Sequence, residues 1–297
     1  MVRSVHPVIR RHRPRSHGAL GVCIALCLAV SAIPTAAATA PAPPGTLAAF
    51  RTLDPLLDGL VPATLYRPAG VGPFPGVVLL HGCGGLGASI YAWGRWLQGA
   101  GYEALVVNSM APRSVKSVCV VGGHPTDRDQ ALDAFGALEY LRTLPEIDPH
   151  RAAVIGWSHG GGAALEIAGA AFVASALPAG GGFQAVIAFY PACTLLPRRG
   201  FSAPTLILIG SEDDWSPPQS CEAGVPPLLA AGAPLEWHLY PNATHAFDTP
   251  GSSRVLHISG RSFTLRYDAQ AAADAHTRVA AFLAQHLAAP RPTRTAP

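Results

Sequence analysis

Short and almost wholly apolar runs recur along most of the chain, and they restrict its fold more than any other feature. They read GVVLL, ALVV, AAVIG, AVIAFY and TLILIG. Strands that are buried on both faces of a parallel sheet have this composition, whereas half-exposed strands alternate apolar and polar residues. We predict strands over residues 62–67, 75–80, 103–108, 152–156, 184–190, 204–210 and 234–240.

Segments with helical periodicity lie between these runs. In DRDQALDAFGALEYLRTL, the residues Leu132, Phe135, Leu138 and Leu141 recur at the spacing of one helix face. Helices are predicted over residues 127–144, 159–172 and 268–287. The alternation of strands and helices indicates an α/β fold with a doubly wound, mostly parallel sheet and helices on both faces.

One such domain accounts for residues 60–288. Residues 39–59 begin with a run rich in Ala, Pro and Thr, and we predict a flexible N-terminal segment there. Residues 250–266 fit neither the strand pattern nor the helix pattern and are predicted to form an irregular insertion. Residues 289–297, rich in Pro and Arg, are predicted to be a disordered tail.

Residues 1–38 are typical of a secretory signal peptide. Five arginines within residues 1–18 precede the apolar run ALGVCIALCLAVSAI, and the small residues TAAATA follow Pro34. We predict cleavage after Ala38 and export to the periplasm or the medium. The alternative is an uncleaved anchor, but the run has 15 residues, whereas a spanning helix needs about 20. No membrane anchor is therefore expected after cleavage.

The charge and the cysteines outside this leader exclude some classes of function. The chain has 21 basic and 18 acidic residues, and the leader's arginines account for the excess of +3. No basic patch remains, which argues against a nucleic-acid partner. An even number of cysteines remains, which permits disulfides with three alternative pairings in an exported protein. Because no Cys-x-x-Cys pair exists, no metal site is expected.

Ser158 is the strongest candidate for a chemical role. It lies in GWSHGG, where a predicted strand ends and a helix begins, and Gly156 and Gly160 leave room for a sharp turn. A G-x-S-x-G turn between a strand and a helix exposes the serine hydroxyl above the sheet as a nucleophile. The alternative is an ordinary glycine-rich turn, in which the serine would need no chemical partners.

A serine nucleophile needs a base and an acid, and in this architecture the acid precedes the base along the chain. The segment GSEDDWSPP places carboxylates directly after one strand, and YPNATHAFD places His245 after another. The carboxylate candidates are Glu212, Asp213 and Asp214. His238 lies within a predicted strand and His257 within the insertion, so each is a weaker candidate for the base.

Acyl transfer also needs hydrogen-bond donors for the oxyanion. One expected donor is the backbone N–H of His159, which directly follows the nucleophile. The other is the N–H of Cys83 in HGCGG, which follows an early strand. His81 in the same loop is assigned a structural role.

The motifs HGCGG, GWSHGG, GSEDDWSP and YPNATHAFD resemble, in order and spacing, those of the dienelactone hydrolase family, over about residues 60–288. The resemblance implies the α/β-hydrolase fold. It selects Asp213 as the acid, because the family pattern G-x-x-D-x-x-x-P falls on Gly210, Asp213 and Pro217. Asp214 is then a loop-capping or surface carboxylate.

Two departures from the family argue against dienelactone itself as the substrate. The founding members, which this chain resembles at the elbow, carry a cysteine where it has Ser158 and a glutamate where it has Gly82. Arg113 is the one candidate for the family's arginines that bind a substrate carboxylate, and a surface or structural role is its alternative.

On this fold the four cysteines all follow strands at the catalytic edge of the sheet. The resemblance implies the pairs Cys83–Cys119 and Cys193–Cys221, with free thiols as the alternative. Cys83 does not lie in a sharp turn between a strand and a helix, as Ser158 does, and it is not expected to be a nucleophile. Large aromatic residues flank the triad, either lining an apolar acyl pocket or belonging to the core. They are Trp157, Trp215 and Phe247.

The sequence thus predicts a serine hydrolase that cleaves a small-molecule ester or lactone through an acyl-enzyme on Ser158, with Asp213 and His245 and without a metal or cofactor. One alternative is a peptidase or acyltransferase with the same triad, because GWSHGG also resembles the elbow of prolyl-oligopeptidase-type enzymes. The other is a catalytically inactive binding protein on a hydrolase scaffold.

Overall fold

The computed structural model describes residues 44–120, 123–198 and 200–289. The predicted signal peptide over residues 1–38 and residues 290–297 of the predicted tail lie outside the described residues. Among the helices of the described part, none combines the length and the apolar content that crossing a membrane requires.

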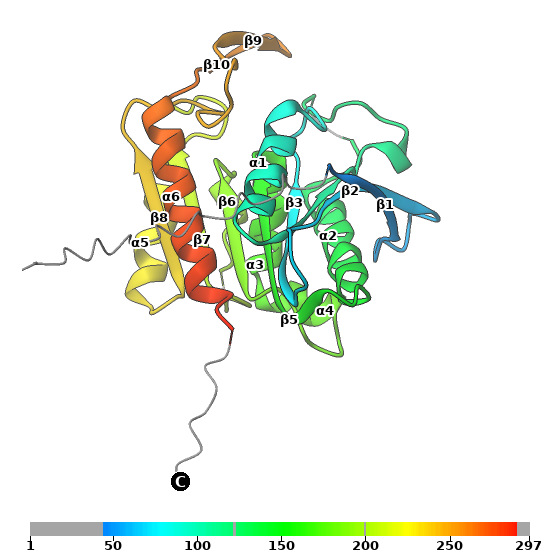
Figure 1. Ribbon diagram of the computed structural model, residues 1–297. Coiled ribbons are helices and arrows are strands. Elements are labelled where there is room, and N and C mark those ends of the chain that lie inside the picture. The colour runs from blue at the N-terminus through cyan, green and yellow to red at the C-terminus, as the bar shows by residue number, and fades with distance from the viewer. Residues whose placement is uncertain (1–43, 121–122, 199, 290–297) are drawn as a thin grey trace, which may run out of the picture. The chain divides into compact units, whose positions relative to one another are not determined.

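Eight strands form one sheet in the order β1-β2-β4-β3-β5-β6-β7-β8 (Figure 1). All neighbours from β4 to β8 pair in parallel, whereas β1 with β2 and β2 with β4 pair antiparallel. The strands are β1 (Thr46–Arg51), β2 (Leu60–Tyr66), β3 (Phe74–Leu80), β4 (Glu103–Val107), β5 (Ile147–Trp157), β6 (Ala185–Phe189), β7 (Thr205–Gly210) and β8 (Leu235–Tyr240). The predicted mostly parallel sheet is thereby confirmed.

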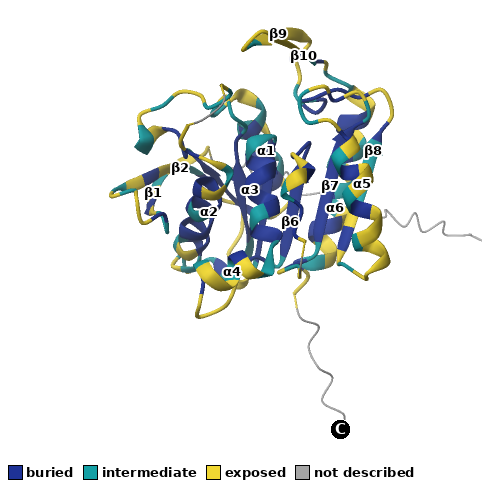
Figure 2. Cartoon of the chain, turned by 180° about the vertical axis from the view of Figure 1, so that it is seen from behind, coloured by how far each residue is buried: buried dark blue, intermediate teal, exposed yellow. Residues whose placement is uncertain are grey.

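Helices cover both faces of the sheet, as Figures 1 and 2 show from opposite sides. On one face α1 (Ala88–Gly99) and α6 (Ala269–His286) meet where Trp93 stacks on His276. On the other face lie α2 (Asp127–Arg142), α3 (His159–Ala168), its continuation α4 (Ala170–Ala176) and α5 (Gln219–Ala230). Single 3₁₀ turns η1 (Ala111–Arg113) and η2 (Cys193–Leu195) follow β4 and β6.

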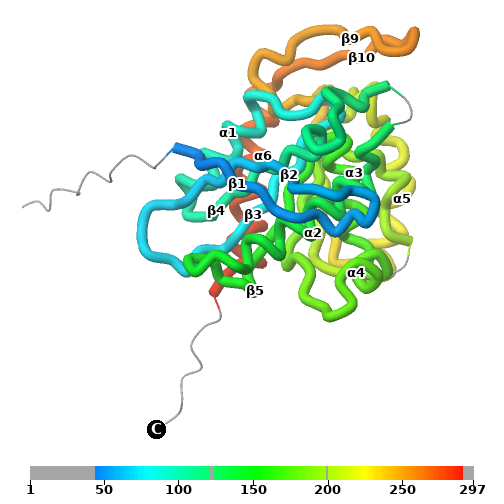
Figure 3. Tube along the Cα trace, turned by 90° about the vertical axis from the view of Figure 1, so that its right-hand side faces the viewer, coloured from blue at the N-terminus to red at the C-terminus, as the bar shows by residue number. Residues whose placement is uncertain are grey.

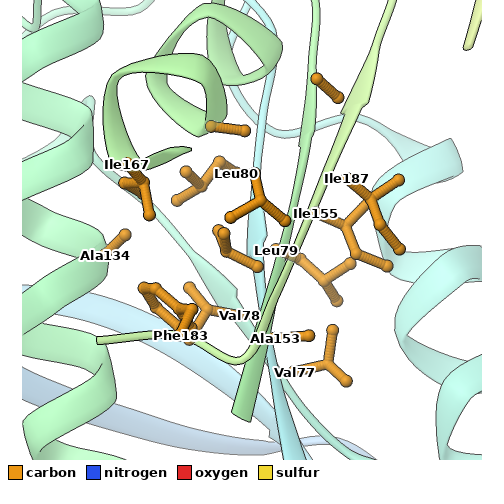
Figure 4. Packing of buried hydrophobic residues seen from close by; sticks show 14 of the residues in the cluster. Val77, Val78, Leu79, Leu80, Ala134, Ala153, Ile155, Ile167, Phe183 and Ile187 are labelled. Atoms are coloured by element: carbon orange, nitrogen blue, oxygen red, sulfur yellow. The ribbon is translucent and has the colours of Figure 1, made fainter. Parts of the chain in front are cut away.

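The core lies where the central strands contact both helix layers. All residues of β6 and the last four residues of β3, Val77–Leu80, are fully buried. In Figure 4, Val78 and Ile167 lie on one side of the sheet, and Val77, Ile155 and Ile187 lie on the other. Burial on both faces explains why these strands have no polar positions, and each large side chain contributes roughly 1.5–3 kcal/mol to stability.

The segment predicted to be flexible contains β1, which extends the sheet beside β2. Polar contacts after β1 fix this segment in place. Thr52 donates to Asp133 on α2 (2.6 Å), and Asp54 pairs with Arg113 (2.8 Å). The sequence does not predict this strand, because Phe50 is the only buried residue of β1 and apolar and polar residues do not alternate along it.

Residues 250–266 contain a β-hairpin rather than an irregular insertion. The strands β9 (Arg254–Ile258) and β10 (Arg261–Leu265) pair antiparallel, and Figure 3 shows them lying beyond the end of the main sheet. Their two-residue turn is Ser259-Gly260, with positive φ at both positions (50° and 75°). This is the pattern of a type I′ turn, which a Ser-Gly pair accommodates less commonly than Asn-Gly.

Candidate active site

A strained turn presents Ser158 at the end of β5. Because β5 ends at Trp157 and α3 begins at His159, Ser158 alone makes the change of direction, with φ 55° and ψ −113°. A Cβ atom on Gly156 would lie 1.8 Å from the Gly160 carbonyl oxygen, and one on Gly160 would lie 2.2 Å from the Leu80 carbonyl oxygen. Only glycine therefore fits at these two positions. The close backbone packing that they permit holds Ser158 in a conformation that costs about 1–3 kcal/mol.

His245 and Asp213 meet Ser158 at this turn. His245 Nε2 lies 2.9 Å from Ser158 Oγ, and its Nδ1 lies 2.8 Å from Asp213 Oδ2. The other oxygen of Asp213 accepts the backbone N–H groups of Trp215 (2.9 Å) and Ser216 (2.7 Å). With Nδ1–H directed to the carboxylate, Nε2 is free to accept the serine proton. The structure therefore brings together the three residues that the sequence selected.

The weaker sequence candidates make other contacts. Both carboxylate oxygens of Asp214 accept the backbone N–H of Thr264 at 3.0 Å, which attaches the hairpin to this loop. His238 lies on β8, 4.0 Å from Asp274, and His257 on β9 bonds Ser262 at 2.9 Å. None of these side chains takes part in the Ser158–His245 arrangement.

The two predicted oxyanion donors lie beside Ser158. A Cβ on Gly82 would be 3.5 Å from Ser158 Cβ, so the loop after β3 adjoins the elbow. The N–H of Cys83 has no acceptor within the described part of the chain. The N–H of His159 belongs to the first turn of α3, where N–H groups have no acceptor within the helix. The His159 imidazole itself lies between Pro125 and Asp127.

His81 anchors the loop that carries Cys83. Its side chain is 1% exposed, its Nδ1 donates to the Gly82 carbonyl at 2.8 Å, and Gln130 donates to its carbonyl at 3.1 Å. Burial lowers the pKa of His81 to about 4, so the ring is neutral at neutral pH. A neutral, buried imidazole fits a structural role.

Both implied disulfides are present, and they lie in different surroundings. Cys83–Cys119 borders the pocket and ties the loop after β3 to the loop after β4, where Val118 also donates to the Cys83 carbonyl at 2.8 Å. Cys193–Cys221 joins η2 to α5 and is buried. With its sulfur in a disulfide, Cys83 can contribute only its backbone to the site.

Ser158 opens into a pocket of about 400 Å³. Trp157 and Trp215 line it as the sequence suggested, but Phe247 does not. That ring is fully buried against Phe189 and Tyr240 and belongs to the core. The sequence did not predict the other lining residues, among which Arg254 and Leu256 lie on the unpredicted hairpin and Tyr190 directly follows β6.

Arg113, the candidate for a substrate-carboxylate binder, is a structural residue. Its side chain is 7% exposed and pairs with Asp54 (2.8 Å) and Asp133 (2.7 Å) away from the pocket. Within the described residues, no group of three or more His, Cys, Asp or Glu side chains is arranged to hold a metal ion.

Comparisons with known proteins agree with this architecture. A dienelactone hydrolase-like promiscuous phosphotriesterase from metagenomic libraries is 22% identical, with 82% of this chain and 98% of that chain covered and a TM-score of 0.63. A thermophilic esterase from Thermogutta terrifontis is 18% identical, with 82% and 94% covered and a TM-score of 0.61. The same esterase phosphorylated by paraoxon gives 19% identity, 82% and 96% coverage and a TM-score of 0.59.

A search of the curated proteins found no match. The model of the dienelactone hydrolase family matches residues 61–287, which is most of the chain. This match covers the sheet from β2 to β8, the hairpin and the closing helix α6. The chain therefore belongs to the dienelactone hydrolase family and is a hydrolase that acts on ester bonds.

Proposed function

We propose that this hydrolase cleaves carboxylic ester or lactone bonds through an acyl-enzyme on Ser158. The observation that carries the proposal is the position of His245, 2.9 Å from the Ser158 hydroxyl and 2.8 Å from Asp213. His245 accepts the hydroxyl proton as Oγ attacks the carbonyl carbon. Asp213 orients the imidazole and stabilises its protonated form.

The backbone N–H groups of Cys83 and His159 hold the oxyanion of the tetrahedral intermediate. His245 then gives its proton to the departing alcohol, which leaves the acyl group on Ser158. A water molecule attacks the acyl carbonyl as His245 removes its proton, and return of that proton to Ser158 releases the acid. The scheme calls for no metal or cofactor.

The surroundings of Ser158 support a serine nucleophile without a second carboxylate. Founding members of the family, as noted above, carry a glutamate at the position of Gly82. Here Gly82 supplies no carboxylate, although a Cβ at that position would lie 3.5 Å from Ser158 Cβ, at ordinary contact distance. We therefore propose substrates other than dienelactone, and a pocket of about 400 Å³ favours small esters with short acyl chains.

The protein is also proposed to act outside the cytoplasm. Two disulfides suggest an oxidising, exported location, and the signal-like leader supports export to the periplasm or the medium. The N-terminal residue of the purified exported protein tests this, and the expected residue is Thr39. Recovery of an intact leader in the membrane fraction would contradict it.

The central experiment compares hydrolysis of p-nitrophenyl esters, from acetate to dodecanoate, by the wild type and by Ser158→Ala. Activity is expected to fall with acyl length and to be lost in the variant. Mass spectrometry after exposure to paraoxon is expected to place a phosphoryl group on Ser158. Equal ester hydrolysis by both proteins would overturn the assignment of Ser158.

The remaining outcomes separate the alternatives. Cleavage of peptides with no ester hydrolysis would indicate a peptidase with the same triad. Acyl transfer to an added alcohol in preference to water would indicate an acyltransferase. Inertness toward esters, lactones, peptides and paraoxon would indicate a binding protein on a hydrolase scaffold.

A further inference from the structure

A buried carboxylate that the proposed reaction does not use lies next to the site. Asp248 follows His245 by three residues and is 4% exposed. Its Oδ2 accepts the indole N–H groups of Trp93 and Trp157, both at 2.9 Å, and its Oδ1 accepts the phenol of Tyr190 at 2.8 Å. We call these four residues the Asp248 cluster. It joins the loop of His245 to α1, to the end of β5 and to the residue after β6.

Two of the three donors adjoin the reacting groups. Trp157 directly precedes Ser158, whose own N–H donates to the Phe189 carbonyl at 2.9 Å. The ring of Tyr190 lies 4.6 Å from the ring of His245, centroid to centroid. Tyr190 also has a positive φ of 37°, unusual for a residue with a side chain. The cluster thus contacts the elbow on one side and the imidazole on the other.

The third donor differs from the other two. Trp93 packs against the rings of Trp157 and Phe189 and stacks on His276, but it does not line the pocket of Ser158. It bonds the same oxygen of Asp248 as Trp157, at the same distance. The two tryptophans therefore form a matched pair. Both make the same hydrogen bond to Asp248, but only Trp157 is next to Ser158 in the chain.

The chemistry of the cluster argues against a purely packing role for Asp248. A carboxylate is costly to bury, and burial raises the pKa of Asp248. Indole N–H groups can only donate, so both tryptophans need an acceptor at this point. An apolar residue of similar size would leave three buried donors without partners. The carboxylate is the group that fixes the orientation of all three aromatic side chains at once.

We propose that Asp248 is a positioning residue. It holds Trp157 and Tyr190 in place, and through them it fixes the positions of Ser158 and His245 relative to each other. This inference rests on the proposed function of Ser158 as the nucleophile. Because the effect passes through the geometry of the nucleophile and base, it changes kcat more than KM.

The first test compares Asp248→Asn with Asp248→Ala. The amide oxygen of Asn can still accept from both tryptophans while its NH₂ group donates to Tyr190, so kcat is expected to stay within about tenfold of the wild type. The Ala variant loses every bond, and kcat is expected to fall by about 100-fold with KM nearly unchanged. Equal kcat values in two folded variants would overturn the proposal.

The matched pair keeps the proposal testable if Asp248→Ala does not fold. Trp157→Phe and Trp93→Phe each remove one bond to Oδ2, and the thermal midpoints of the two variants are measured alongside kcat. Trp157→Phe is expected to lower kcat at least tenfold more than Trp93→Phe at a similar loss of stability. Equal effects on kcat would assign the cluster to stability alone and overturn the proposal.

Crystal structures of the Asp248 variants distinguish this proposal from that for Ser158. The distance from Ser158 Oγ to His245 Nε2, 2.9 Å in the wild type, is expected to lengthen in Asp248→Ala and to be kept in Asp248→Asn. An unchanged distance in both would overturn the positioning role, even in a protein with full esterase activity. A lengthened distance would support it, even if ester hydrolysis proved independent of Ser158.

Discussion

The two sides of the active-site pocket are built in different ways. On one side, the elbow and the loop after β3 approach each other so closely that glycines at 156 and 160 have no space for a side chain. On the other side stands the β9–β10 hairpin, whose Val255 is 52% exposed. The hairpin is held at its base by Phe263, which stacks on Trp215 at 4.7 Å, and by the Asp214 bonds to Thr264.

From this difference we expect the elbow side to serve the reaction and the hairpin side to serve the choice of substrate. On the elbow side, backbone contacts leave no space for a Cβ on Gly156 or Gly160. This side carries Ser158, which we propose as the nucleophile, and the N–H groups of Cys83 and His159, which we propose as the oxyanion donors. The hairpin side adds Arg254 and Leu256 to the pocket from an exposed element with few buried contacts. Exposed elements tolerate substitution better than crowded backbone. Changes on the elbow side are therefore expected to abolish activity or folding, and changes on the hairpin to alter selectivity.

Asp213→Asn tests the elbow side most severely. Loss of the carboxylate that fixes the tautomer of His245 is expected to lower kcat by about 10⁴-fold. The control is Asp214→Asn, which changes the neighbouring carboxylate that holds the hairpin, and its kcat is expected to stay within about fivefold. Equal losses in the two variants would show that the hairpin loop takes part in the reaction.

Gly160→Ala is expected to lower the free energy of unfolding by about 4 kcal/mol. Its Cβ would lie 2.2 Å from the Leu80 carbonyl oxygen, which belongs to a central strand and cannot move aside. Chemical denaturation measures the loss. Gly99→Ala is the control, since no atom lies within 4 Å of the added methyl group. A loss below about 1 kcal/mol in Gly160→Ala would mean that the elbow side is not crowded.

His81 gives the elbow side a dependence on pH. Burial lowers its pKa from 6.5 to about 4, so the unfolded chain takes up a proton at a higher pH than the folded protein. The free energy of unfolding is therefore expected to fall by about 3 kcal/mol as pH decreases from about 6.5 to about 4. His81→Gln should flatten this slope relative to the wild type. Identical slopes in the two proteins would refute the assignment.

Phe263→Ala loosens the base of the hairpin. Loss of the stack on Trp215 is expected to raise KM for the preferred ester by up to about tenfold, with kcat within about threefold. Steady-state kinetics on the p-nitrophenyl series measures both constants. A fall in kcat comparable to that of Asp213→Asn would remove the distinction between the two sides.

Arg254→Ala is expected to have the smallest effect. This side chain lines the pocket and pairs with no carboxylate among the described residues. KM for an ester with an anionic acyl group, such as a hemisuccinate, is expected to rise about two- to fivefold. KM for the neutral acetate ester should not change, and equal changes for the two esters would mean that charge is not what Arg254 recognises.

The sequence carried enough information to predict the strands and the candidate residues of the elbow side. Buried parallel strands have no polar positions, so GVVLL, AAVIG and TLILIG were recognisable, and the loops after them held Cys83, Ser158 and Asp213. Motif order and strand position selected Cys83 and Ser158, and the resemblance to the family selected Asp213 among three neighbouring carboxylates. The structure brings them to the same edge of the sheet.

The sequence carried less information about the hairpin side and about the Asp248 cluster. In the hairpin, β9 carries the exposed Val255 beside Leu256, and only Phe263 and Leu265 of β10 are buried. This short apolar pattern was too weak to predict two strands, so only the Ser-Gly turn marked the hairpin. Asp248 is the last residue of YPNATHAFD, but only His245 was given a role in that motif, and the contacts of Asp248 come from donors on three distant elements. Phe247 was misplaced for a related reason, since proximity to His245 along the chain does not fix which way a ring points.

The contacts of Arg113 bear on where a shortened version of this protein can begin. The family match starts at residue 61, but a chain cut there would lack β1, Thr52 and Asp54. Asp133 would lose the hydroxyl that donates to it, and Arg113 would keep only one of its two carboxylates in a site where it is 7% exposed. We therefore expect a chain that begins at residue 61 to be less stable than one that begins at Thr46 or earlier, ahead of the point where similarity to the family begins.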